Sequence, residues 1–292
     1  MRKVKKEFNI FNLLVGLLLL AHALVLLILL AFLFSTSLKS QKLFDQNFFA
    51  FPDFQFSNFS EAIKAFKFQV TRGFDMVEVS LFPEIIEYTI LYTLGGAFVS
   101  ALVPCLVSYV VAKFPGVMSK ILSGIVIVTM MVPIVGNQPA MIDILFSLNL
   151  YDSILGALAM RANFLGMYFL IYVAAFSSLS DSYREAAYID GASEWTVMLK
   201  IMFPLVKTIF LTVLLIQFVD CWNDYSIPLL YLPSHPTIAY GVYYMSNTTV
   251  TGLAHPTYKM ASCMIMVIPT VTLFIIFRDR LMGNLSMGGI KG

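Results

Sequence analysis

Charged residues are scarce in this sequence. Only 12% of its 292 residues are charged, whereas 59% are hydrophobic and the mean hydropathy is +0.83. Soluble domains carry about a quarter charged residues and bury one compact core. The composition therefore excludes an ordinary soluble domain and indicates a chain whose solvent is lipid.

The motifs of several functional classes are also missing. The sequence has no glycine-rich loop ending in Lys-Ser or Lys-Thr, so we do not expect the chain to bind ATP in that manner. It has neither a His-Glu-x-x-His zinc motif nor a Gly-x-Ser-x-Gly nucleophile, which argues against an intramembrane enzyme. Inverted repeats, which are typical of ion-driven transporters, are not evident.

Cysteine and histidine are few, and their spacing predicts no metal site. Cys105, Cys221 and Cys263 lie inside or at the ends of apolar segments without disulfide or metal-ligand spacing, so we interpret them as packing residues. His235 and His255 are each followed by proline and lie far apart, so we interpret them as loop histidines.

Long apolar stretches dominate what is present. A helix that crosses the hydrocarbon needs about 20 mostly apolar residues. Stretches of that length lie at 12–34, 87–112, 119–138, 153–178, 208–231 and 260–277. The sequence therefore predicts an all-α membrane protein with six transmembrane helices. The first stretch is too long for the core of a signal peptide and lacks a cleavage site, which favours a retained helix.

The third stretch is the least regular. Pro133, Gly136, Asn137 and Pro139 interrupt its end, and the apolar segment that follows, 141–148, leaves a re-entrant segment open as an alternative. Broken backbone at that depth is tolerated where it is buried in protein or faces a water-filled path.

Lysine and arginine set the expected orientation, because they are retained on the cytoplasmic side. They lie at Arg2, Lys3, Lys5, Lys6, Lys113, Lys120, Arg184, Lys200, Lys207, Arg278, Arg280 and Lys291. This pattern places both termini inside. It predicts residues 1–11 as a cytoplasmic terminus, 12–34 as the first transmembrane helix, 35–86 as an extracytoplasmic loop, and 87–292 as a core of five transmembrane helices with a cytoplasmic tail. In the loop, Ser60 is expected to cap a short helix from Glu61 to Phe68.

One polar segment, 181–204, lies between the fourth and fifth stretches. Ser182 and Glu185 have the spacing of a capping box, which predicts a short helix. Gly191 suits the left-handed turn that ends a helix, and Ser193 is placed to cap a second one. Pro204 then predicts a kink where the chain re-enters the membrane. Two alanines in the first helix are expected on the surface of this compact knob.

The same segment resembles the EAA signature of ABC importer permeases. The residues that carry the resemblance are Glu185, Ala186, Ala187, Asp190, Gly191, Ile201 and Pro204. Phe203 stands where leucine is usual, and 190–193 is similar to the carbohydrate-uptake branch of the family. Further segments, 130–133, 148–153, 222–224 and 287–292, resemble maltose-type permeases in the same order along the chain.

The resemblance implies a non-catalytic permease subunit that forms the path for a sugar or oligosaccharide. It implies a second related permease, two cytoplasmic ATP-binding subunits that hold ATP and Mg, and an extracytoplasmic solute-binding protein as partners. It also implies a multi-pass protein of a bacterial-type plasma (inner) membrane, surrounded by lipid, with no cofactor of its own and no nucleic acid. The EAA segment would be the coupling loop to the ATPases. An importer for a peptide, amino acid or other polar solute remains the alternative.

Polar residues inside the apolar stretches are candidates for the path, because such residues are costly in lipid and usually functional. They are Arg161, Gln217, Asp220, Trp222, Asn223 and Asp224. For Arg161 the structural alternative is a buried pair with Asp143 or Asp220. For Trp222 the alternative is the interfacial aromatic belt.

Overall fold

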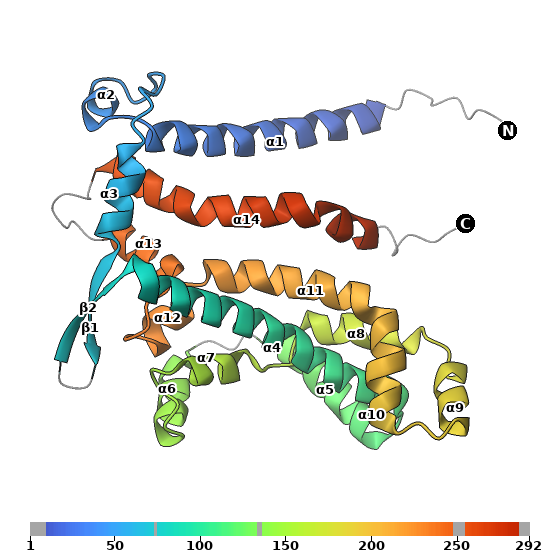
Figure 1. Cartoon of the computed structure of the whole chain (residues 1–292). Helices are drawn as coiled ribbons and strands as arrows, with labels where there is room; N and C mark the ends of the chain where they lie inside the picture. The colour runs from blue at the N-terminus through green and yellow to red at the C-terminus, as the bar shows by residue number, and fades with distance from the viewer. Residues whose placement is uncertain (1–9, 73–74, 133–135, 248–254, 286–292) are drawn as a thin grey trace. The chain divides into compact units, whose positions relative to one another are not determined.

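A computed structural model describes residues 10–72, 75–132, 136–247 and 255–285 (Figure 1). In the first part of the chain the elements are α1 (Ile10–Ser37), α2 (Gln41–Gln46), α3 (Ser57–Ala65), β1 (Lys67–Arg72), β2 (Asp75–Ser80), the π-helical turn η1 (Leu81–Ile85), α4 (Ile86–Lys113), α5 (Val117–Met131) and α6 (Gln138–Ser147). The second part holds α7 (Ile154–Arg161), α8 (Met167–Ser177), α9 (Ser182–Ile189), α10 (Glu194–Val197), the π-helical turn η2 (Met198–Met202), α11 (Phe203–Asn223), α12 (Ser226–Tyr231), α13 (Ile238–Asn247) and α14 (Pro256–Leu285).

Three of the described helices are long and apolar enough to cross a membrane: Leu13–Ser37, Pro83–Lys113 and Glu194–Asn223. They cover the first, second and fifth predicted stretches. The 30-residue helix α14 covers the sixth. The third stretch corresponds to α5, and α6 follows it after residues 133–135, which lie outside the described part.

The fourth predicted stretch, 153–178, is not one helix. It is divided into α7 and α8 by residues 162–166. At this break the side-chain oxygen of Asn163 accepts the backbone N–H of Leu165 at 2.8 Å, a local bond that competes with the helical ladder. The fifth stretch is also divided, into α11 and α12. The side chain of Asp224 accepts the N–H of Ser226 at 2.8 Å, and α12 begins at Ser226.

The all-α expectation needs a correction. The helix predicted from Glu61 to Phe68 with a Ser60 cap instead runs from Ser57 to Ala65, and Lys67 already belongs to a strand. Strands β1 and β2 pair antiparallel, with Lys67 opposite Ser80 and Arg72 opposite Asp75. Val70 and Val79 are buried, so each strand turns an apolar side chain toward the protein, as the alternation of side chains along a strand allows.

The chain forms two compact units. One contains residues 1–65 and 244–267, and the other contains 66–243 and 268–292. In the first unit, α1 has no buried residue in its apolar window, so its side chains face outward. At the carboxyl-terminal end of α1, the side-chain amide of Asn58 donates to the carbonyls of Ser37 at 2.9 Å and Lys39 at 2.7 Å.

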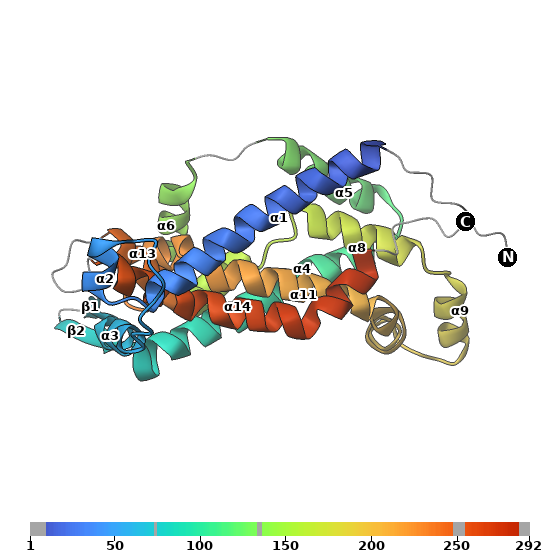
Figure 2. The ribbon, with the colours of Figure 1, turned by 90° about the horizontal axis from the view of Figure 1, so that it is seen from above.

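The core of the second unit lies where α4 packs against α8 and α11, which run beside it in both views (Figures 1 and 2). Its buried residues include Ala101, Cys105, Tyr109, Tyr172, Phe176, Val206, Phe210 and Val213. A Cβ at Gly96 would stand 3.0 Å from the sulfur of Cys221, so glycine lets α11 approach α4 closely. Cys105 and Cys221 are free and buried, which confirms the packing interpretation.

Candidate functional site

A buried ion pair joins three helices of the second unit. Arg161 ends α7, and its guanidinium donates to Asp224 at 2.5 Å and to the Tyr92 hydroxyl of α4 at 2.8 Å. The Tyr92 hydroxyl donates to the same Asp224 oxygen at 2.5 Å. The side chains of Arg161 and Asp224 are only 18% and 12% exposed, so the charge is compensated where little water reaches it.

This arrangement corrects the pairing suggested by the sequence. The partner of Arg161 is Asp224, rather than Asp143 or Asp220. Asp143 lies on α6 and Asp220 on α11, whereas Asp224 follows the last residue of α11, where the chain turns toward α12. Sequence spacing alone cannot predict that turn.

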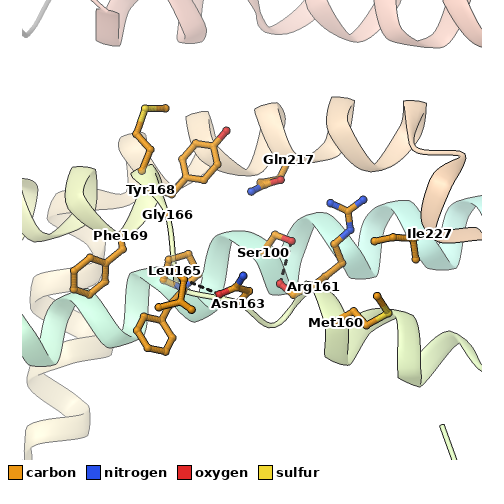
Figure 3. A pocket seen from close by; sticks show the side chains of 13 residues that line it. Ser100, Met160, Arg161, Asn163, Leu165, Gly166, Tyr168, Phe169, Gln217 and Ile227 are labelled. Carbon is orange, nitrogen blue, oxygen red and sulfur yellow. Dashed lines mark hydrogen bonds between the residues drawn. The ribbon is translucent and has the colours of Figure 1, made fainter. Parts of the chain in front are cut away.

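A cavity of about 320 Å³ opens beside the ion pair (Figure 3). Its lining residues are Ser100, Pro104, Met160, Arg161, Asn163, Phe164, Leu165, Gly166, Met167, Tyr168, Phe169, Gln217 and Ile227. Neutral hydrogen-bonding groups come from four places: Ser100 from α4, Asn163 from the α7–α8 break, Tyr168 from α8 and Gln217 from α11. This cavity has the mixed apolar and polar lining that small-molecule sites usually show.

A second cavity of about 490 Å³ also includes Arg161 in its wall. Its lining residues are Arg161, Val219, Asp220, Asn223, Asp224, Ser226 and Ile227. Arg161 and Ile227 line both cavities. Both cavities therefore reach the Arg161 side chain, and the second also reaches Asp224.

Five of the six path candidates line these cavities: Arg161, Gln217, Asp220, Asn223 and Asp224. Trp222 is not among the lining residues. Its ring stacks on that of Phe218 instead, with centroids 6.0 Å apart and an interplanar angle of 15°. The sequence did not single out Ser100, Asn163 or Tyr168. Asn163 had a usable signal, because it is an amide close to a glycine within an apolar stretch.

The polar segment 181–204 folds as two short helices around a glycine turn. Gly191 has φ +77°, and the N–H of Ala192 reaches back to the Ala187 carbonyl at 2.9 Å, as in a glycine-terminated helix. Ser193 accepts the N–H of Thr196 at 3.4 Å and caps α10. Both features confirm the sequence prediction.

Three details of this segment differ from expectation. The capping box is absent, because Asp181 occupies the N-cap position of α9 and the Ser182 hydroxyl pairs with that of Ser180 at 2.8 Å. Ala187 is buried in the core of the unit, so only Ala186 of the two alanines is exposed. Pro204 does not divide the helix, which runs from Glu194 to Asn223 and is irregular just before the proline, at the π turn η2.

Hydrogen bonds tie this segment to the end of α4. The Tyr109 hydroxyl of α4 and the Tyr188 hydroxyl of α9 each donate to one carboxylate oxygen of Glu194 at the start of α10. Arg184 donates to the Lys113 carbonyl at 2.9 Å, and its guanidinium lies 4.7 Å from the centre of the Phe114 ring.

The buried Lys113 completes the attachment. Its ammonium donates to the Leu179 carbonyl at 2.7 Å and to the Asp181 carboxylate at 2.9 Å. The hydrogen bond from Lys113 lowers the pKa of Asp181, and the positive charges of Lys113 and Arg184 act in the same direction. Consequently α9 and α10 are held as a compact knob on α4.

The outer surface of the knob carries the other signature residues. Glu185, Ala186, Asp190 and Gly191 are exposed, and Ile201 packs partly on the core. Ile189 and Trp195 beside them are 86% and 70% exposed. Exposed apolar side chains among polar ones are typical of a surface that binds another protein.

The histidines make local contacts in connecting segments. His235 lies 3.2 Å from Asp152, and His255 lies 3.2 Å from Asp45. Burial raises the pKa of Asp152, but hydrogen bonds from His235 and Ser234 outweigh it, so the pKa is lowered overall. In the described part of the chain, no three His, Cys, Asp or Glu residues are grouped to hold a metal ion.

Long apolar helices, a buried and compensated charge and cavities with polar groups in their walls describe a helical, membrane-embedded protein. The chain belongs to the family of binding-protein-dependent transport system inner membrane components, whose model matches residues 104–286. Members of this family are permease subunits, which are not catalytic.

Two relatives and one solved structure place the chain more closely. The melibiose/raffinose/stachyose import permease protein MelC of Bacillus subtilis is 25% identical over 98% of both chains. The probable ABC transporter permease protein PH1216 of Pyrococcus horikoshii is 28% identical over 52% of this chain and 55% of that protein. A chain of a bacterial ABC transporter involved in alginate import has the same fold, with a TM-score of 0.75 over 96% of this chain and 99% of its own, at 22% identity.

Proposed function

We propose that this chain is a membrane-spanning subunit of an ATP-driven importer and forms part of the path for a neutral sugar or oligosaccharide. One observation carries the proposal: two cavities with polar groups in their walls both reach Arg161, whose charge is already compensated by Asp224. The names of similar permeases, among them MelC and the trehalose transport system permease protein SugB of Mycobacterium tuberculosis, favour a sugar over a peptide or amino acid.

The chemistry of the lining suits such a solute. Ser100, Asn163 and Gln217 offer neutral donors and acceptors for hydroxyl groups, while the aromatic side chains around them match the CH faces of a sugar ring. The second cavity adds Asp220 and Asn223, with no cation other than the paired Arg161 among its lining residues. An acidic solute in the second cavity would face the carboxylate of Asp220 and no unpaired positive charge among the lining residues.

The orientation is proposed from the distribution of lysine and arginine. Six helices cross a bacterial-type plasma membrane with both termini in the cytoplasm. Residues 35–86 and 232–258 then lie outside, and 113–120, 179–207 and 278–292 lie inside.

The knob of α9 and α10 is proposed as the coupling loop. Its exposed residues would dock on a cytoplasmic ATP-binding subunit, two of which hold ATP and Mg, and a second related permease and a solute-binding protein would complete the importer. The C-terminal segment 287–292, which resembles a tail that contacts the ATPases, lies outside the described residues.

The test is to purify the chain with its associated subunits and measure ATP hydrolysis in lipid. We expect an ATPase to copurify and its activity to rise with a solute-binding protein loaded with a neutral saccharide, tried as melibiose, raffinose and trehalose. A set of peptides and amino acids serves as the comparison. Stimulation by a peptide and by none of the saccharides would exclude the sugar assignment, and absence of any ATPase would exclude the importer.

A further inference from the structure

Five exposed phenylalanines crowd the loop between α2 and α3, residues 47–56, which we call the phenylalanine loop. They are Phe48, Phe49, Phe51, Phe54 and Phe56, and their exposed fractions range from 49% to 87%. A concentration of large exposed apolar side chains usually marks an interaction surface. The loop lies in the first compact unit, at the carboxyl-terminal end of α1 (Figures 1 and 2).

Hydrogen bonds hold this loop in place. The N–H of Ser40 donates to the Asp53 carboxylate at 2.8 Å, and the N–H of Gln55 donates to the Leu38 carbonyl at 2.7 Å. The amide of Asn58 binds the carbonyls at the end of α1, as described above. The loop is therefore an ordered structure fixed to the end of α1, and the phenylalanines are exposed in a defined arrangement.

The loop folds back along α1. The ring of Phe49 lies 6.3 Å from that of Phe32, and the rings of Phe48 and Phe49 lie 4.1 Å apart. Phe32 precedes the end of α1 at Ser37 by about 7.5 Å, at the helical rise of about 1.5 Å per residue. Phe49 is thus level with the last turns of α1 and lies beside them.

Lys39 secures this position. Its ammonium donates to the Phe48 carbonyl at 2.6 Å and lies 5.7 Å from the centre of the Phe32 ring. Burial of this side chain lowers the pKa of Lys39. The ammonium of Lys39 therefore fixes the backbone at Phe48 against the last turns of α1.

We infer that the phenylalanine loop inserts into the membrane leaflet at the carboxyl-terminal end of α1. The apolar window of α1 has no residue buried by the described part of the chain, and Phe49 continues that exposed apolar surface from the side. Interfacial apolar groups are typically buried about 5–10 Å into the headgroup and acyl boundary, and Phe49 lies beside a residue about 7.5 Å from the end of α1. The loop is a second, non-spanning anchor for this end of α1.

The test is the quenching of a single tryptophan by brominated lipid. The full chain with Trp195→Phe, Trp222→Phe and Phe49→Trp is placed in phosphatidylcholine vesicles that carry bromine either near the headgroup end or near the methyl end of the acyl chain. We expect at least about twofold quenching, stronger with the bromine near the headgroup, and emission shifted to the blue. A variant with Phe51→Trp in place of Phe49→Trp repeats the measurement in case the first does not fold.

Trp195 is the matched control, because it is 70% exposed on the knob of the other unit. In a variant with only Trp222→Phe it should show little quenching. The inference is overturned if the tryptophans introduced by Phe49→Trp and Phe51→Trp are both as weakly quenched as Trp195. It is also overturned if the quenching disappears when the solute-binding protein or the second permease is added, because a protein would then cover the loop. Because the chain alone is measured first, the result does not depend on which solute is transported.

Discussion

At the scale of single residues, the pair of Arg161 and Asp224 shows how burial changes the cost of a substitution. Each side chain is more than four-fifths buried and compensates the other. Removing one partner leaves an uncompensated charge, which typically costs about 3–5 kcal/mol, whereas replacing both with apolar groups is often tolerated.

We therefore expect Asp224→Leu and Arg161→Leu each to lower the unfolding temperature of the detergent-solubilised protein by several degrees. The double variant should be more stable than either single one. Unfolding is followed by the fluorescence of a thiol dye or by light scattering. A double variant whose loss equals the sum of the two single losses would show that the two residues act independently.

Gly191 gives a second residue-scale prediction. At φ +77°, any side chain is strained, and a β-branched one is strained most. Nothing lies within 4 Å of the position that a Cβ would take, so space is not the limitation. Gly191→Ala should cost about 1–2 kcal/mol, and Gly191→Val more. ATPase copurification and stimulation should fall in the same order, and full stimulation in Gly191→Val would show that the turn is not needed for coupling.

At the scale of elements, Glu194 joins α4, α9 and α10 through the hydroxyls of Tyr109 and Tyr188. We expect Glu194→Gln, and Tyr109→Phe combined with Tyr188→Phe, to loosen the knob from α4. ATPase association should persist, since the exposed signature residues Glu185, Ala186 and Asp190 are unchanged, while stimulation of hydrolysis falls. Tyr183→Phe is the control, because this tyrosine is exposed on the same helix. An equal effect in Tyr183→Phe would show that the contacts of Glu194 are not specific.

Acid should weaken the same attachment. The pKa of Asp181 is lowered by its hydrogen bond with Lys113, so its stabilising contribution is fully present above the ordinary carboxyl value of about 3.9 and is lost as the pH falls through the lower, folded value. The difference in stability between the parent protein and Asp181→Asn should therefore be present at neutral pH and vanish in acid. If the difference in stability persisted unchanged below the folded pKa of Asp181, it would have to arise from something other than the charge of Asp181.

The sequence predicted some of these elements well and others poorly, for physical reasons. The glycine turn at Gly191 and the Ser193 cap depend on local backbone chemistry, so they could be predicted. The capping box failed because α9 begins at Ser182 itself, which leaves Asp181 in the N-cap position. The break at Asn163 has a local cause that hydropathy alone does not report, whereas the pairing of Arg161 with Asp224 depends on how distant helices meet.

At the scale of the whole molecule, the proposed topology can be tested by impermeant thiol labelling. In a cysteine-free version, the thiol introduced by Asp75→Cys should be labelled from the outer side of the membrane, and the one introduced by Asp190→Cys should be protected in intact cells. Both positions are exposed, so access depends on the side of the membrane. Labelling of position 190 from outside would reverse the orientation and move the knob away from any cytoplasmic ATPase.

The helix that begins at the knob has one more consequence. Residues 194–223 form a single helical segment of 30 residues, so Glu194 and the start of the Asp224 turn are the two ends of one rod about 45 Å long. The rod contains a π turn at 198–202, which holds one more residue than a regular α-turn. If that turn relaxed to a regular one, everything beyond it would rotate by about 100° and advance by about 1.5 Å. Asp224 would then move away from Arg161, and the ion pair beside the two cavities would open.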